Sequence, residues 1–154
     1  MFKRALIIVL LAIILFLAVS NFLSKEKPSY QAEVLNANEQ NIKIGKIDLL
    51  VDIADESNER AQGLSGRDKM AENKGMLFIF PQPGSYDFWM KDMLFSLDMV
   101  WVDAAGTIVA ITKDISPDTF PKTFEPPSPI KYVIEVNSGW SDRNNVKVGD
   151  KVSF

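Results

Sequence analysis

Three blocks of sequence decide the fold of this chain: ERAQGLSGR at residues 59–67, GMLFIF at 75–80, and DFWMKDMLFSLDMVWVDAAG at 87–106. The second block is a short, continuous apolar run, which is typical of a strand that is buried on both faces. The third block passes through a turn at 103–106 into the apolar run 107–112, and this pattern predicts a β-hairpin. A sheet therefore lies at the centre of the protein.

Further strands are expected on either side of these blocks. Residues 41–44 and 47–53 alternate apolar and polar side chains across Gly45-Lys46, which predicts a second hairpin. The remaining predicted strands cover residues 86–90, 94–102 and 131–137, and residues 146–154 are expected to supply a turn and a closing strand. Many short strands joined by turns are typical of an antiparallel sheet or barrel.

Two short helices and one long loop complete the predicted domain. Asp55 or Ser57 is expected to cap a helix that runs through Leu64. Residues 139–144 suit one or two helical turns. Five of the eight prolines fall within 116–129, so this segment is expected to be a stiff loop. The predicted fold is mainly β (β-rich α+β): a compact, mostly antiparallel sheet or barrel with two short helices.

The N-terminal segment predicts a membrane anchor. A basic start, Met1–Arg4, precedes an apolar segment from Ala5 to Leu23, about the length that spans a bilayer. The positive end should stay cytoplasmic, which places the remainder outside the membrane. The alternative is cleavage after the small residues 18–20, which would give a secreted or periplasmic protein.

The expected organisation therefore has three parts. Residues 1–23 form a transmembrane anchor or signal segment whose apolar part, 5–23, contacts the lipid bilayer. Residues 24–40 form a polar linker of low apolar content, and residues 41–154 form a single extracytoplasmic domain.

Composition excludes several classes of chemistry. The chain has no Cys and no His, so it lacks the usual thiolate, the commonest general base and the usual transition-metal ligands. Apart from Lys3 and Arg4 it carries 15 basic and 20 acidic residues, a net charge of −5. This charge argues against nucleic-acid binding. No cofactor is expected.

Trp89 lies in the densest aromatic segment, FWMKD at 88–92. It could form an exposed platform on which a ligand or sugar ring stacks. Large aromatic side chains are usually mostly buried, however, so the sequence favours a core position for Trp89.

Asp98 interrupts an apolar run, and a carboxylate in such a place needs a partner. Arg67 and Arg60 are the expected partners, because a guanidinium can bind a carboxylate through two parallel hydrogen bonds. A structural ion pair is favoured over a carboxylate that lines a polar cleft.

Glu135, between Ile134 and Val136, resembles Asp98 in its apolar surroundings. With Asp98 and Asp87 it could form a carboxylate group for acid–base hydrolysis or for Ca²⁺. No loop of the Asp-x-Asp-x-Asp kind is present, so no metal site is expected.

Several blocks, taken in order, resemble the domain-of-unknown-function family 192 (DUF 192): ERAQGLSGR, GMLFIF, FWMKDM, SLDMVWVDAAGTIV, YVIEVNSG and VKVGDKV. The resemblance covers residues 47–152. The resemblance implies a compact, mainly β domain, often exported behind a signal or membrane anchor, and it implies no established activity, cofactor or catalytic residue. The family positions matched here are Glu59, Arg60, Gly63, Leu64, Arg67, Gly75, Met76, Phe88, Trp89, Met90, Asp98, Asp103 and Gly106.

The expected function is that of a membrane-anchored extracytoplasmic domain that binds a small polar ligand or an envelope protein without catalysis. Arg67, Trp89, Asp98 and Glu135 are the candidate ligand-binding residues. The alternative is a hydrolase or carbohydrate-active enzyme that uses carboxylates, with Asp98 paired to Glu135 or Asp87. A purely structural module is the third possibility.

Overall fold

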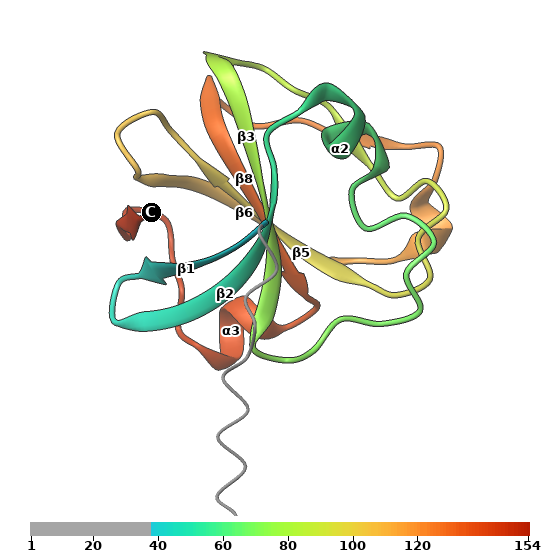
Figure 1. Ribbon diagram of the computed structural model, residues 1–154, viewed down its shortest axis with the longest axis horizontal. Helices are drawn as coiled ribbons and strands as arrows, with labels where there is room; N and C mark the ends of the chain where they lie inside the picture. Colours follow the sequence, from blue (N-terminus) through green and yellow to red (C-terminus); the bar gives the residue numbers. More distant parts are fainter. Residues whose placement is uncertain (1–37) are drawn as a thin grey trace, which may run out of the picture. The chain divides into compact units, whose positions relative to one another are not determined.

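A computed structural model describes residues 38–154 (Figure 1). The predicted anchor at 1–23 and nearly all of the predicted linker lie outside the described residues. Within 38–154, no helix is long and apolar enough to cross a membrane. The described residues belong to one compact unit.

The described residues are mostly β-structure, with two short α-helices. The strands are β1 (Glu39–Ile44), β2 (Ile47–Ala54), β3 (Lys74–Gly84), β4 (Phe88–Trp89), β5 (Leu97–Val102), β6 (Ile108–Ile115), β7 (Thr123–Phe124), β8 (Ile130–Asn137) and β9 (Val152–Ser153). The helices are α2 (Ser57–Gln62), α3 (Trp140–Arg143) and the 3₁₀-helix η1 (Pro117–Thr119).

Seven strands form one curled sheet, a half-barrel with the order β6-β5-β8-β3-β2-β1-β9 (Figure 1). Its pairs are antiparallel except for β2 and β3, which α2 connects as a parallel pair. The C-terminal segment bridges the two ends of the sheet: β9 pairs with β1, and the Val152 N–H donates to the Gly106 carbonyl at 2.8 Å. The predicted mostly antiparallel, barrel-like sheet is thus confirmed.

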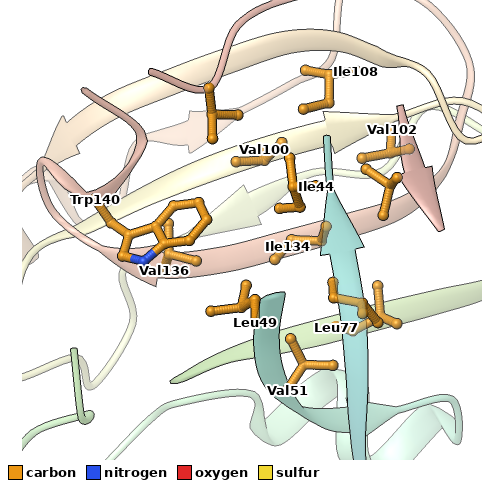
Figure 2. Close-up of a cluster of buried hydrophobic side chains, with 13 residues drawn as sticks. Ile44, Leu49, Val51, Leu77, Val100, Val102, Ile108, Ile134, Val136 and Trp140 are labelled. Carbon is orange, nitrogen blue, oxygen red and sulfur yellow. The ribbon is translucent and has the colours of Figure 1, made fainter. Parts of the chain in front are cut away.

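The concave face of the sheet holds one of two apolar cores. Side chains from seven strands meet there: β1, β2, β3, β5, β6, β8 and β9 (Figure 2). They can meet because the sheet curls around them. Trp140 of α3 closes one part of this core. We call this side of the sheet the inner face.

The opposite side, the outer face, carries the second core. Side chains that alternate with the inner ones along β3, β5 and β8 form it, among them Phe78, Met99 and Val133. The covering side chains come from the end of α2 and from the segments 85–95 and 116–129, which lie on one side of the sheet in Figure 1. The candidate functional site lies in this outer layer.

Both predicted hairpins are confirmed, with Ile44 opposite Ile47 and Val102 opposite Ile108. Other boundaries differ. The predicted cap at Asp55 or Ser57 is wrong: α2 has its N-cap at Glu56, where the Glu59 carboxylate accepts the Glu56 N–H at 3.2 Å. This backbone hydrogen bond and a hydrogen bond from Asn38 lower the pKa of Glu59.

Two strand predictions were also inaccurate in length. The buried run that starts at 75 continues as β3 to Gly84, although prolines 81 and 83 disturb its pairing with β8 beyond Ile79. The predicted strand 86–90 shrinks to β4, two residues long, because its partner is the equally short β7 rather than the main sheet.

Candidate functional site

A cavity of about 240 Å³ opens in the outer layer, between α2, the main sheet and β4. Five aromatic side chains line it: Phe78, Phe80, Tyr86, Phe88 and Trp89. The other lining residues are Arg60, Ala61, Gln62, Gly63, Leu64, Ser65, Asp87, Met93 and Glu135. The cavity thus combines an aromatic wall with a few polar groups, as small-molecule sites usually do.

The aromatic wall is held together by ring contacts. Phe80 and Tyr86 stack with ring centroids 3.7 Å apart. Phe88 meets Phe78 edge to face at 5.0 Å and Trp101 at 5.5 Å. Such edge-to-face contacts stabilise a fixed arrangement of rings, so the wall is preformed.

The end of α2 approaches this wall closely. Gly63, which ends the helix, has φ +49, and a Cβ at this position would lie 3.3 Å from the Phe78 ring. A glycine therefore suits both the left-handed backbone and the close contact.

Trp89 is 53% exposed, so the core position favoured from the sequence is wrong. The physical reason is that Trp89 lies on the two-stranded β4–β7 unit. No segment within residues 38–154 fully covers the outer side of this unit. Its indole meets the exposed Phe120 ring edge to face at 6.1 Å. Trp89 thus forms the rim of the cavity and offers an accessible aromatic surface.

Glu135 has the most unusual environment in the site. It lies on β8, flanked on the outer face by Met76 of β3 and Met99 of β5. Its side chain lines the cavity, yet the residue is only 5% exposed. Within residues 38–154, no hydrogen bond or ion pair engages its carboxyl group. Burial raises the pKa of Glu135 to about 8.

Arg60 is the cation of the cavity lining, and the backbone holds its guanidinium. The Arg60 Nη1 donates a hydrogen bond to the Ile79 carbonyl at 2.9 Å and another to the Asp55 carbonyl. The Cζ lies 5.5 Å from the centroid of the Phe80 ring. Arg60 therefore braces α2 against β3 while its positive charge rests on the aromatic wall.

Asp98 is fully buried, but it lies on the other side of the sheet. It pairs with Val136, an inner-face residue, whereas Glu135 pairs with Met99 on the outer face. Side chains directly opposite in an antiparallel pair share a face, so Asp98 and Glu135 point in opposite directions. These two carboxylates do not form one catalytic pair.

The arginine partners expected for Asp98 were also wrong. Its Oδ1 accepts the N–H groups of Asp114 and Gly139, each at 3.1 Å, and its Oδ2 accepts the Ser141 N–H at 3.0 Å. Backbone amides supply the hydrogen bonds that a guanidinium was expected to supply. Asp98 thereby ties β5 to the end of β6 and to the start of α3.

Arg67 pairs instead with Asp52 of β2, with Nη1 2.5 Å from Oδ2. Both residues line a second, shallower cavity of about 570 Å³ on the other side of α2. Gln62 and Gly63 line both cavities. Of the four candidate residues, the structure brings Trp89 and Glu135 to one cavity, and it places Arg67 on the second cavity and Asp98 on the other face of the sheet.

Sequence reasoning missed Arg60 as a cavity residue, along with Phe80 and Tyr86. Phe80 was expected at the end of the strand 75–80 and Tyr86 at the start of the strand 86–90, and the stacking of their rings depends on the irregular end of β3 and the loop after it. The signal for Glu135 was present, because a single acidic residue in an apolar strand is unusual.

The residues of this domain match a known family model over 38–154, described as an uncharacterised protein family, DUF192. The chain belongs to the DUF192 family. The match covers the whole described part of the chain, which confirms the resemblance that was recognised in the ordered sequence blocks. No curated protein matches the chain.

Two solved structures of similar fold show how this DUF192 domain relates to others. A Sinorhizobium meliloti protein, described only as a candidate transcription regulator, is 31% identical with a TM-score of 0.72, covering 75% of this chain and 92% of that one. A Novosphingobium aromaticivorans protein of unknown function is 25% identical, also with a TM-score of 0.72, covering 75% and 85%.

Replacing Asp98 with Asn should destabilise the domain by about 2 kcal/mol or more. An amide has one acceptor oxygen where the carboxylate has two, so at least one of the three backbone N–H groups would face an NH₂ group. Urea unfolding of Asp98→Asn measures the loss. The same change at the exposed Asp68 should alter the free energy of unfolding by less than about 0.5 kcal/mol. Equal values for the two variants would contradict the role given to Asp98.

Replacing Glu135 with Gln should change how stability depends on pH. The folded protein keeps the Glu135 proton up to about pH 8, whereas the unfolded chain releases it near the ordinary value of 4.5. The unfolded state therefore binds fewer protons between these values, and wild-type stability falls as pH rises through this window. The free energy of unfolding of Glu135→Gln, relative to that of wild type, should therefore increase by about 1.4 kcal/mol per pH unit in this window.

Urea unfolding at pH 5, 6, 7 and 8 measures this slope. The exposed Glu125 offers a matched control, because Glu125→Gln makes the same chemical change outside the cavity and should keep the wild-type slope. Parallel pH profiles for wild type and Glu135→Gln would show that Glu135 titrates normally in the folded domain.

Proposed function

We propose that this domain binds a small polar ligand in the aromatic cavity without catalysing a reaction on it. Trp89 and Glu135 are the principal contacts. The observation that carries the proposal is the Glu135 carboxyl, which is buried, faces the cavity and has no partner within residues 38–154.

The free-energy cost of this arrangement favours a functional role. A carboxyl group in largely apolar surroundings, which reaches water only through the cavity, is less stable than an exposed one. A purely apolar side chain at the same position would avoid that cost. Ionisable groups with strongly shifted pKa values in a cavity are characteristic of functional sites.

The other two candidate residues have secondary places in this proposal. Arg67 lies on the second cavity, which Gln62 and Gly63 separate from the first, so a longer ligand would reach it. Asp98 acts from the inner face, where its hydrogen bonds to backbone amides keep β5 in register beneath the cavity.

A hydrolase is the second candidate function, and one observation favours it. Asp87 lines the same cavity as Glu135, and a carboxyl with a pKa near 8 suits a general acid at neutral pH. In this case Glu135 would protonate a leaving group and the exposed Asp87 would act as the second carboxylate. Turnover of a glycoside library that Asp87→Asn abolishes would establish this candidate over simple binding.

Nucleic acid does not enter the proposal, although one similar structure is described as a candidate transcription regulator. A net charge of −5 outside the first four residues repels the phosphate backbone. Among the described residues that line the cavity, Arg60 is the one basic side chain, so the cavity does not offer a basic surface to phosphate groups.

We also propose that the domain works outside the cytoplasm on a membrane anchor. The support is the sequence pattern alone: two basic residues, then an apolar segment from Ala5 to Leu23, then a polar segment. The anchored state is favoured over cleavage because Phe22 and Leu23 continue the apolar segment beyond the small residues at 18–20.

Protease treatment of intact spheroplasts that express the full chain tests this topology. A tag after Phe154 should be digested while a cytoplasmic marker stays intact, and the chain should sediment with membranes. Replacing Lys3 and Arg4 with Glu should reduce the digested fraction. A tag that is protected until the membrane is lysed would contradict the proposed orientation.

Trp89→Ala should weaken ligand binding about tenfold, which corresponds to the loss of one aromatic contact. An unbiased small-molecule screen on the full chain, followed by NMR of the three indole N–H groups, identifies ligands and locates them. The exposed Val148 supplies the control, because Val148→Ala also removes an exposed apolar group and should leave affinity unchanged. Hits that perturb neither Trp89 nor Glu135 would contradict the proposed site.

A further inference from the structure

The charges that line the cavity point to the charge of its ligand. The titratable side chains that line it with Glu135 are Arg60 of α2 and Tyr86 and Asp87 of the segment between β3 and β4. Arg60 and Asp87 carry opposite charges. Ionisation of Glu135 would therefore leave the lining with a net charge of −1.

Nothing in residues 38–154 neutralises that charge. Arg60 is the cation of the lining, and its guanidinium is already held by two backbone carbonyls and the Phe80 ring. The pKa of Glu135 rises through burial alone, which agrees with the absence of a nearby positive charge that would lower it. An ionised Glu135 would therefore need a cation with hydrogen-bond donors from outside residues 38–154.

We propose that the ligand is a small primary amine whose ammonium group donates hydrogen bonds to the Glu135 carboxylate. This inference rests on the proposed binding function and names the chemical class of the ligand. A charge-assisted N–H···O⁻ bond is among the strongest that a buried carboxylate can form. It would satisfy oxygen atoms that no group within residues 38–154 engages.

The aromatic wall suits the same ligand. Ring faces attract cations, and Arg60 already places one cation 5.5 Å from the Phe80 centroid. The apolar part of an amine would lie against the rings of Phe78 and Phe88, and Trp89 would cover the mouth of the cavity. A cavity of about 240 Å³ admits a short alkyl or aryl amine and excludes large polymers.

Binding of such a ligand is coupled to proton release. At pH 7 the free site holds the Glu135 proton, because the pKa of Glu135 is about 8. An alkylammonium ion stays charged up to about pH 10, as the lysine side chain does. The ammonium ion binds the ionised carboxylate, so affinity should rise about tenfold from pH 6 to pH 7 and level off above pH 8.

The test compares three probes of matched size on the full chain: 1-aminobutane, 1-butanol and butanoate. Affinities are measured at pH 6, 7, 8 and 9 by NMR titration of the Trp89 indole signal. At pH 8 the amine should bind at least about tenfold more tightly than the alcohol, and butanoate should bind least. The alcohol should show no pH dependence.

Two variants test the assignment to Glu135. Glu135→Gln should bring the amine to the affinity of the alcohol and remove the pH dependence, whereas Glu125→Gln should behave as wild type. Isothermal titration of wild type at pH 7 in buffers of different ionisation enthalpy should show release of nearly one proton per amine bound. Glu135→Gln should release none.

The inference is overturned if the alcohol or butanoate binds as tightly as the amine, or if amine affinity is independent of pH. Its failure is distinguishable from failure of the proposed function. If the screen finds ligands that occupy the cavity but none of them is an amine, the proposed ligand class is contradicted and the proposed binding function still stands. A screen that finds no molecule in the cavity contradicts both.

Discussion

Side-chain alternation along β8 is the constraint on which the rest of the structure depends. β8 is an interior strand of the curled sheet and pairs with β3 on one side and β5 on the other. Ile134 and Val136 face the inner core, which forces Glu135 between them onto the outer face, beside Met76 and Met99. A slip of one residue would bury Glu135 in the closed inner core and remove it from the cavity.

The segments of the outer layer form a cavity around Glu135. In the main sheet, Phe78 and Phe80 follow Met76 along β3 and form one wall. α2 and the β4–β7 unit form the other walls, and the rim at Trp89 stays accessible. A buried carboxyl with an open path to solvent differs from one that is sealed, as the comparison with Asp98 shows. Asp98 accepts its hydrogen bonds from the protein itself, whereas the Glu135 carboxyl faces the cavity, where we propose that a ligand binds it.

Much of the fold could be predicted from the sequence, because local patterns determine it. The two hairpins follow from alternation across short turns, and the ordered blocks identified the family. The environment of the site residues depends on contacts between distant segments. The amides that bind Asp98 come from residues 114, 139 and 141, and the partner of Arg67 is Asp52. No local pattern in the sequence indicates such pairs. Trp89 is exposed because its strand pairs with β7 rather than with the main sheet.

The buried Glu135 carboxyl has no hydrogen-bond partner within residues 38–154 and faces the cavity in which we propose that a ligand binds. The most direct test of this arrangement is a ¹³C NMR titration of the Glu135 side-chain carboxyl carbon in the ligand-free full chain, assigned by the signal that disappears in Glu135→Gln. The expected midpoint is about pH 8, well above the ordinary value of 4.5. A midpoint at the ordinary value would show that the carboxyl is solvated or paired, and would contradict the account.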